Sequence, residues 1–187
     1  SYDNHGFSAL DQINRENVSE LELSWRMPLQ TGVNNPGPLV HDGVMYLFTF
    51  PDTVLAIDAG NGSLLWRYEH HSEVQPSQKK GVALHGDLVY VPTSDLHVLA
   101  LNARTGKLVW DHKIETDDQY DGYHLRMSPF VVGETVIQGI TSLRIPEGGW
   151  IDGIDRTTGA HKWRFYTIPR PDEPGGNTWN GIPMEER

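Results

Sequence analysis

The sequence predicts an all-β protein of the β-propeller class, built from repeated four-stranded units. Three segments that end at Trp66, Trp110 and Trp163 share one pattern: a small residue, an Asp or Asn two positions later, then a Gly and the Trp. The first two of these tryptophans lie 44 residues apart and the last two 53. A period of about 40–45 residues with four strands in each unit is typical of propeller blades. The repetition therefore predicts the architecture before any single motif is considered.

Each unit is expected to alternate short strands with tight turns. Residues 54–58 are interpreted as a half-buried strand with a period of two. The Asp and Gly of the repeat predict a turn, because a carboxylate accepts hydrogen bonds from amides ahead of it and Gly adopts a positive φ. The repeated Trp is expected to fill the wedge between neighbouring sheets, and not to bind a ligand. Helical signals are confined to residues 14–21.

The repeats divide a single domain, residues 1–187, into a lead-in with one closing-blade strand, three blades and a Pro- and Gly-rich connector. Trp25 is followed by Arg, as are Trp66 and Trp163, so the lead-in contains the last strand of a blade. The prolines of the connector cannot supply the missing strands, and bare sheet edges promote aggregation. We therefore expect the remaining blades to come from another chain or from a cleaved C-terminal part. The lead-in spans residues 1–29, the three blades span residues 30–70, 71–115 and 116–168, and the connector spans residues 169–187.

Composition excludes several kinds of partner and site. The net charge of −10 argues against nucleic acid, which requires a basic face. The absence of cysteine excludes disulfides, thiolate nucleophiles, iron–sulfur ligation and c-type haem attachment within this chain. No apolar run approaches the roughly 18 residues that a membrane helix requires. The polar N-terminus lacks the apolar core of a signal peptide, so we expect that any export signal has been removed.

Several stretches resemble the pyrroloquinoline quinone (PQQ)-dependent alcohol dehydrogenases. The repeats resemble the tryptophan-docking motif of that family, A-x-D-x-x-T-G-x-x-x-W. Residues 8–18 are similar to its N-terminal lead-in, and residues 164–169 and 175–181 to the stretch after its third blade. The resemblance covers the whole chain in order.

The resemblance implies a quinoprotein oxidoreductase on an eight-bladed propeller, located in the periplasm or secreted. Such an enzyme oxidises an alcohol with PQQ and a calcium or lanthanide ion, and passes electrons to an acceptor such as a cytochrome. The family's metal-binding Asn and catalytic Asp correspond to positions further along than residue 187. The resemblance therefore implies no catalytic residue in this chain, which would be active only as part of the complete propeller.

The resemblance also implies the early half of a quinone pocket. Asn35 stands about where many members carry a quinone-contacting Glu, Lys80 where many carry an Arg, and Arg126 where a Thr is common. Blade geometry brings equivalent positions to a common axis, so we expect these three residues to converge. A positive funnel suits a quinone with three carboxylates or another anion. Taken singly, the cations could equally be solvated loop side chains.

The metal position departs from the family pattern. An ungapped match places Arg144 where the metal-binding Glu should be, which adds this cation to the cofactor-binding set. A guanidinium offers no lone pair to a hard cation. Glu147, three residues further on, is the one candidate ligand.

Three functions are compatible with these observations. The leading interpretation is the N-terminal portion of a PQQ-dependent alcohol dehydrogenase completed by further blades. The alternative is a non-catalytic propeller scaffold that resembles the outer-membrane assembly lipoproteins, which share the docking motif. A third is a propeller whose basic funnel binds a different anionic ligand. An Asn and an Asp at the starts of the next inner strands would decide for the enzyme.

Overall fold

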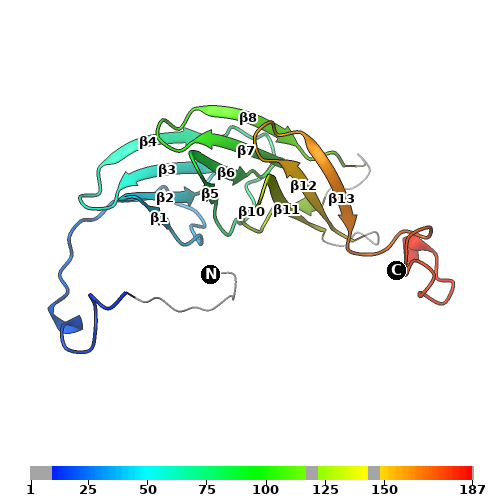
Figure 1. Ribbon diagram of the computed structural model, residues 1–187, viewed down its shortest axis with the longest axis horizontal. Helices are drawn as coiled ribbons and strands as arrows, with labels where there is room; N and C mark the ends of the chain where they lie inside the picture. The colour runs from blue at the N-terminus through cyan, green and yellow to red at the C-terminus, as the bar shows by residue number, and fades with distance from the viewer. Residues whose placement is uncertain (1–9, 117–121, 143–147, 187) are drawn as a thin grey trace.

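The computed structural model describes residues 10–116, 122–142 and 148–186. They form three antiparallel sheets that follow one another along the chain (Figure 1), and each contains a meander of four strands. The sheets are β1–β4, β5–β8 and β10–β13. This arrangement confirms the all-β prediction.

The element bounds show how short the strands are. The first sheet comprises β1 (Leu39–His41), β2 (Val44–Thr49), β3 (Thr53–Asp58) and β4 (Leu64–Glu69). The second comprises β5 (Ala83–His85), β6 (Leu88–Pro92), β7 (His97–Asn102) and β8 (Leu108–Lys113). The third comprises β10 (Phe130–Val132), β11 (Thr135–Ser142), β12 (Trp150–Asp155) and β13 (His161–Tyr166). Among the described residues, the helices are the single 3-10 turns η1 (Val18–Glu20) and η2 (Met184–Glu186), and neither could span a membrane.

The third sheet carries a strand that the repeat did not predict. β9 (Tyr123–His124) pairs with Thr141 and Ser142 at the end of β11. This longer β11 and its extra partner lie within the longer interval of 53 residues between Trp110 and Trp163.

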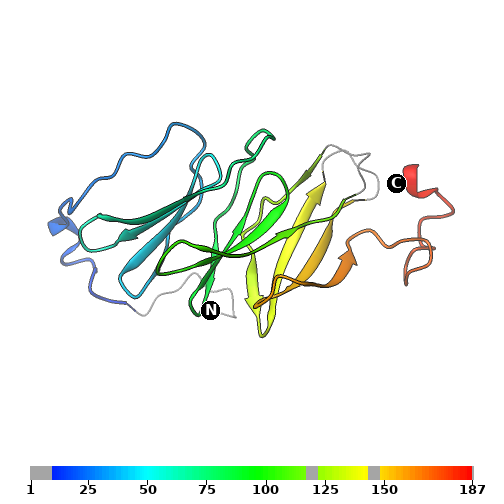
Figure 2. The ribbon, with the colours of Figure 1, turned by 90° about the horizontal axis from the view of Figure 1, so that it is seen from above.

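The sheets form a fan in which each packs face to face on the next. In Figure 1 the first strand of each sheet lies along the concave edge and the fourth strand along the convex edge. Figure 2 shows the three sheets side by side from above, with the N-terminal and C-terminal segments at opposite ends. The concave edge therefore corresponds to the propeller axis.

Packing between sheets decides the burial of the middle strands. On β7, Val98 and Ala100 belong to the apolar cluster shared with the third sheet, whereas Leu99 and Leu101 belong to the cluster shared with the first. All four side chains are fully buried. The interpretation of the equivalent strand, β3, as half-buried was wrong, because residues 53–57 are all buried. The core of the protein thus lies between the sheets.

The repeated tryptophans join one unit to the next. The indole Nε1 atoms of Trp25, Trp66 and Trp110 each donate a hydrogen bond to a backbone carbonyl of the following sheet, at 2.8–3.0 Å. Each indole also lies against the repeat glycine of that sheet; a Cβ on Gly106 would come within 2.7 Å of the Trp66 ring. The expected wedge role is therefore confirmed. The three bonds are Trp25 to Ala59, Trp66 to Ala103 and Trp110 to Arg156.

Trp25 docks although its segment forms no strand. Residues 21–30 have no ladder partner among the described residues, and the predicted closing-blade strand, whose partner strands were expected from another chain or a C-terminal part, stays a prediction. The indole contact is made by one side chain, whereas a strand requires a neighbouring strand for its backbone groups.

The repeated Asp and Asn cap turns as expected. The Oδ1 atoms of Asp58, Asn102 and Asp155 each accept two backbone N–H groups from the residues two and three positions ahead. Hydrogen bonds from Thr158, followed by that from Thr157, lower the pKa of the Asp155 carboxyl. These groups are structural.

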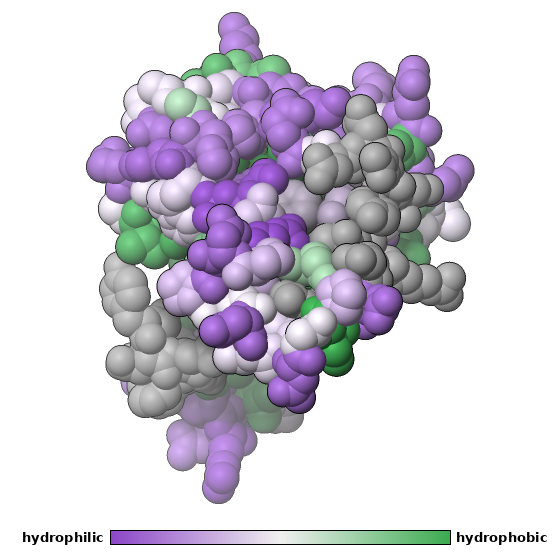
Figure 3. All heavy atoms as spheres, turned by 90° about the vertical axis from the view of Figure 1, so that its right-hand side faces the viewer, coloured by the Kyte–Doolittle hydropathy of each residue, from purple (hydrophilic) through white to green (hydrophobic). Residues whose placement is uncertain are grey.

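The outer face of the third sheet is open among the described residues. Trp163 is 40% exposed and Phe165 62% exposed, whereas Trp66 and Trp110 are at most 9% exposed. Seen from this end, hydrophobic side chains lie among polar ones (Figure 3). Trp163 holds the same repeat position as Trp66 and Trp110, each of which docks on a following sheet.

Candidate functional site

The loops that enter the first strands of the three sheets meet at Gly81. A Cβ on Gly81 would lie 3.2 Å from Ser128 Oγ, 3.9 Å from Pro36 Cβ and 4.0 Å from the carbonyl oxygen of Gly37. The φ of Gly81 is +145°, a conformation that favours glycine. The inner edge thus brings together residues that lie about 45 positions apart in the sequence.

The residues predicted to bind a cofactor stand beside this meeting point in the chain. Asn35 precedes Pro36, Lys80 precedes Gly81, and Arg126 lies two residues before Ser128. Asn35 and Lys80 are exposed, and Arg126 is half-buried. Arg144 and Glu147 lie outside the described residues, so both assignments stay predictions.

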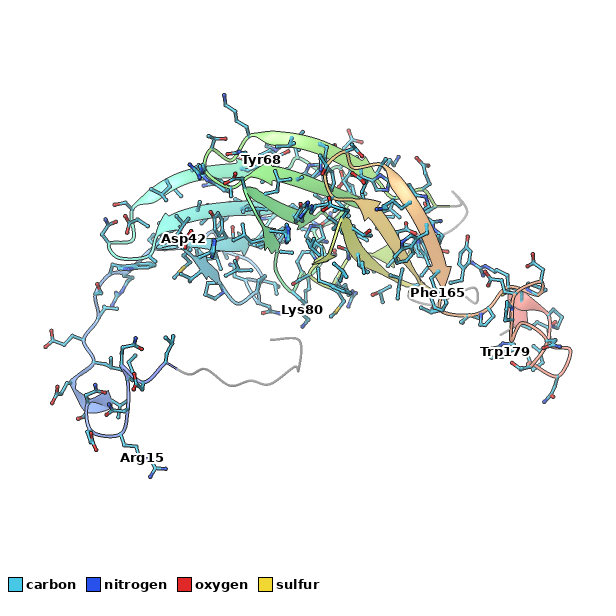
Figure 4. The ribbon with its side chains drawn as sticks, in the orientation of Figure 1. Arg15, Asp42, Tyr68, Lys80, Phe165 and Trp179 are labelled. Carbon is cyan, nitrogen blue, oxygen red and sulfur yellow. The ribbon has the colours of Figure 1, made fainter. Side chains whose placement is uncertain are left out.

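The two adjacent lysines have opposite environments. Lys80 is exposed at the concave edge of the fan, where Figure 4 labels it. Lys79 is only 2% exposed. Of the pair, Lys80 is therefore the one whose ammonium is exposed, and its role in ligand binding stays a prediction.

Lys79 belongs to a buried network that sequence reasoning missed. Its Nζ donates to the hydroxyl of Ser77 and, at 3.4 Å, to that of Ser94. Ser94 Oγ in turn donates to Asp52 Oδ1 at 2.9 Å. Burial lowers the pKa of the Lys79 ammonium to about 8; the attraction of Asp52 and Asp95 opposes this shift, and Arg126 adds to it.

Arg126 presents an unused donor. Its Nε is buried and has no hydrogen-bond partner among the described residues. Gln138, fully buried on β11, donates from Nε2 to the carbonyl oxygens of Met127 at 3.3 Å and Gly139 at 2.8 Å, but its Oε1 is unpartnered. Buried polar atoms without partners are rare and costly. An additional polar group beside Arg126 would relieve that cost.

An open cavity of about 720 Å³ lies between the second and third sheets and beside the loop of residues 70–82. Two of its lining residues form imidazole–carboxylate hydrogen bonds: Asp95 with His70 at 2.8 Å, and His97 with Asp111 at 2.6 Å. Burial raises the pKa of Asp95, but hydrogen bonds from Thr93 and His70 outweigh burial and lower it. The polar side chains that line the cavity include His71, Glu73, Asp95, His97 and Lys113.

A charged pair that is separate from the Lys79 cluster joins β12 to β13. The Arg164 guanidinium donates to both carboxylate oxygens of Asp152 at 2.8 Å, and Asp152 is fully buried. Arg164 also lies 4.4 Å from the centre of the Trp150 ring and donates at 3.1 Å to the carbonyl oxygen of Glu115, after the second sheet. Burial opposes the charge of Arg164, but the hydrogen bonds and charge of Asp152 outweigh it and raise its pKa.

Comparison with known proteins decides the family. The family model described as the glucose/ethanol/alcohol dehydrogenase β-propeller domain, abbreviated PQQ, matches residues 1–186. The chain belongs to this PQQ propeller family. The predicted resemblance is confirmed.

Curated relatives of the chain are named as alcohol dehydrogenases. The chain is 36% identical to the dehydrogenase subunit of the quinone alcohol dehydrogenase of Gluconacetobacter polyoxogenes, over 93% of the chain and 25% of that relative. It is 38% identical to the quinohemoprotein alcohol dehydrogenase ADH IIB of Pseudomonas putida, over 90% of the chain and 25% of that protein. The chain thus spans about a quarter of the length of these relatives.

Solved structures agree with the fold. The quinohemoprotein alcohol dehydrogenase ADHIIG of Pseudomonas putida HK5 superimposes with a TM-score of 0.82 at 34% identity, covering 93% of this chain and 27% of that one. A europium-containing methanol dehydrogenase gives 0.77 at 29% identity, covering 89% and 30%. BamB of Moraxella catarrhalis gives 0.52 at 24% identity, covering 71% and 36%, and this likeness shows the fold alone.

The described residues fit an anionic quinone better than a metal. Lys80 is an exposed cation, and Arg126 has a buried donor without a partner, so both can serve carboxylates. Within residues 10–116, 122–142 and 148–186, no group of three or more His, Asp or Glu side chains is placed to hold a metal ion.

Proposed function

We propose that this chain forms the first blades of a periplasmic PQQ-dependent alcohol dehydrogenase and supplies one side of its cofactor pocket. The observation that carries the proposal is the meeting of the loops of Asn35, Lys80 and Arg126 at Gly81, in a chain of the PQQ family. Bound PQQ would supply the two-electron redox chemistry. The residues of this chain would bind and orient it.

Each residue has a distinct proposed part. Lys80 would hold a quinone carboxylate with its exposed ammonium, although it lacks the planar fork of an Arg. Arg126 would donate through its unpartnered Nε to a second oxygen. Asn35 would contribute a neutral hydrogen bond in place of a carboxylate, which avoids repulsion of an anionic ligand. Arg144 would add a further cation, and Glu147 would be a ligand if a calcium or lanthanide ion is bound.

The catalytic groups would stand on further blades. The exposed Trp163 and Phe165 form the face on which the next blade would dock, as Trp66 and Trp110 do at the internal junctions. The substrate would be an alcohol. The electron acceptor would be a cytochrome; one relative, from Methylobacterium organophilum, is named methanol dehydrogenase [cytochrome c] subunit 1.

Titration of the complete apo-protein with PQQ tests the proposal. A charge-assisted hydrogen bond is worth about 1.5–3 kcal/mol, so Lys80→Ala should raise the Kd about tenfold to a hundredfold. Lys107→Ala is the matched control, because Lys107 is an exposed lysine in the turn between β7 and β8. An unchanged Kd for Lys80→Ala would remove Lys80 from the site. No binding of PQQ by the wild type would favour the scaffold function.

A further inference from the structure

The loop of residues 70–82 carries the proposed ligand residue Lys80 near its end. Buried polar groups from two turns of the neighbouring sheets hold this loop in place. Asp52 lies in the turn between β2 and β3 and is 3% exposed, and Ser94 lies in the turn between β6 and β7 and is 5% exposed. Lys79, 2% exposed, comes from the loop itself. Three separate segments of two sheets therefore share one buried cluster.

The cluster grips the loop at its start, its middle and its end. At the start, His70 N donates to the carbonyl oxygen of Asp52 at 3.0 Å. In the middle, Ser77 N donates to Ser94 Oγ at 2.9 Å. At the end, Lys79 Nζ donates to the hydroxyls of Ser77 and Ser94. The last anchored residue immediately precedes Lys80.

Ser94 is the centre of the cluster, and Asp52 fixes it. Ser94 donates from Oγ to Asp52 Oδ1 at 2.9 Å and from its backbone N to Asp52 Oδ2 at 2.6 Å. Both carboxylate oxygens of Asp52 are thus occupied by one residue of the neighbouring sheet. Asp52 itself has a φ of +31°, a left-handed conformation that few non-glycine residues adopt. Backbone of this kind persists where the surrounding contacts over-determine it.

Stability alone does not explain a buried lysine at this place. Its ammonium is separated from the Asp52 carboxylate by the Ser94 hydroxyl, and burial disfavours its charge. Apolar side chains of similar volume often replace buried ionic groups without loss of stability. What the polar cluster adds over apolar packing is direction, because each hydrogen bond fixes one donor against one acceptor.

We propose that Lys79 is a positioning residue. Through Ser77, Ser94 and Asp52 it fixes the end of the 70–82 loop, so that Lys80 is directed into the proposed cofactor pocket at the concave edge. This inference rests on the proposed function, in which Lys80 binds a quinone carboxylate. Lys79 itself does not touch the ligand. Its effect on cofactor binding therefore passes through Lys80.

A double-mutant cycle tests this dependence in the complete protein. Apo-protein is titrated with PQQ for the wild type, Lys79→Met, Lys80→Ala and the double variant. Residues that act together give non-additive effects. Lys79→Met should raise the Kd about tenfold when Lys80 is present, and less than about twofold when Lys80 is already Ala. Lys107→Met, at an exposed site, should leave the Kd unchanged.

Equal effects of Lys79→Met in both backgrounds would show a merely structural role and overturn the proposal. So would an unchanged Kd when Lys80 is present. If Lys79→Met fails to fold because the Asp52 carboxylate loses its counter-charge, the neutral pair Lys79→Met with Asp52→Asn takes its place in the cycle.

Amide hydrogen exchange separates this proposal from the proposed function, because it needs no quinone. Lys79→Met should speed exchange in residues 70–82 and leave the strands β6 and β7 as protected as in the wild type. Unchanged protection of the loop would refute the positioning role even if PQQ binds. Conversely, the wild type could bind no PQQ while Lys79→Met still speeds exchange in the loop. That result would refute the proposed function and support the role of Lys79 as the loop anchor.

Discussion

The junction between the first and second sheets and the junction between the second and third are joined by the same tryptophan contact, but they bury different charged groups. Trp66 and Trp110 donate to the next sheet at 2.8 and 3.0 Å and lie on equivalent glycines. The first junction also buries Lys79 with a serine between it and a carboxylate. The second buries Arg164 directly on both oxygens of Asp152.

The difference separates a repeated structural contact from two charged clusters that occur once each. At the second junction a planar guanidinium matches the carboxylate fork and stacks on Trp150, so the charges are well compensated. At the first junction the ammonium is poorly compensated, and its pKa falls to about 8 because of burial. The better-matched pair joins strands of one sheet, whereas the costlier group anchors a loop of the proposed pocket.

The largest expected effect is the loss of the Asp152–Arg164 pair. Arg164→Met removes the bidentate cation from a fully buried carboxylate, which keeps Trp150 Nε1 at 3.2 Å and His161 Nε2 at 3.6 Å, and this should lower the free energy of unfolding by about 3–5 kcal/mol. The control is Arg156→Met, which breaks a pair with the exposed Glu134 and should cost at most about 1 kcal/mol. Denaturant unfolding of both variants measures the difference. Equal losses would contradict the assignment of Asp152 and Arg164 as the well-compensated pair.

The next effect is the pH dependence that Lys79 should produce. Its pKa is about 8 in the folded protein and 10.5 when unperturbed, so the unfolded chain binds more protons between these pH values. Stability should therefore rise from pH 8 to 10.5, by up to about 3 kcal/mol at about 1.4 kcal/mol per pKa unit. The rise should be absent in Lys79→Met. Parallel stability curves for the two proteins would show that Lys79 titrates normally.

The smallest of the three effects tests what the junctions share. Gly106→Ala places a methyl group 2.7 Å from the Trp66 ring, whereas Gly86→Ala meets nothing within 4 Å. Both glycines have a positive φ, of +70° and +57°, so both variants carry the same backbone cost. Gly106→Ala should be less stable than Gly86→Ala by about 1–3 kcal/mol because of overpacking. Equal unfolding temperatures of the two variants would mean that the Trp66 ring shifts to admit the methyl group without loss of stability.

Local and periodic features were predictable from the sequence. Asp58 caps its turn by accepting hydrogen bonds from the amides two and three residues ahead. The contact was predictable because both partners lie within the same short sequence motif. The docking of Trp66 on the next sheet was predictable because the same spacing recurs around Trp110 and Trp163. The meeting of the inner loops at Gly81 was predictable from blade geometry, which brings equivalent positions of successive blades to a common axis. The ligand roles of Asn35, Lys80 and Arg126 come from the family resemblance and stay predictions.

The pairing of non-repeated residues was not predictable. Nothing in two consecutive lysines within an irregular loop indicates that Lys79 is buried and Lys80 exposed. Lys79 donates to Ser94, and Ser94 donates to Asp52, which lies 42 positions earlier in the sequence and shares no motif with it. The burial of β3 on both faces was not predictable either, because the residues of one strand do not indicate whether a neighbouring sheet covers its second face.

The blade and its turns follow from the sequence alone, because each depends on short-range spacing that repeats along the chain, and the family follows from its resemblance to known motifs. Which charges are buried depends instead on how the sheets pack. The desolvation that lowers the pKa of Lys79 exists only once two sheets have packed together. The carboxylate of Asp152 is likewise fully enclosed only in the folded third sheet, where β13 brings Arg164 onto it. Burial is a property of the assembled sheets, and no single stretch of sequence contains it.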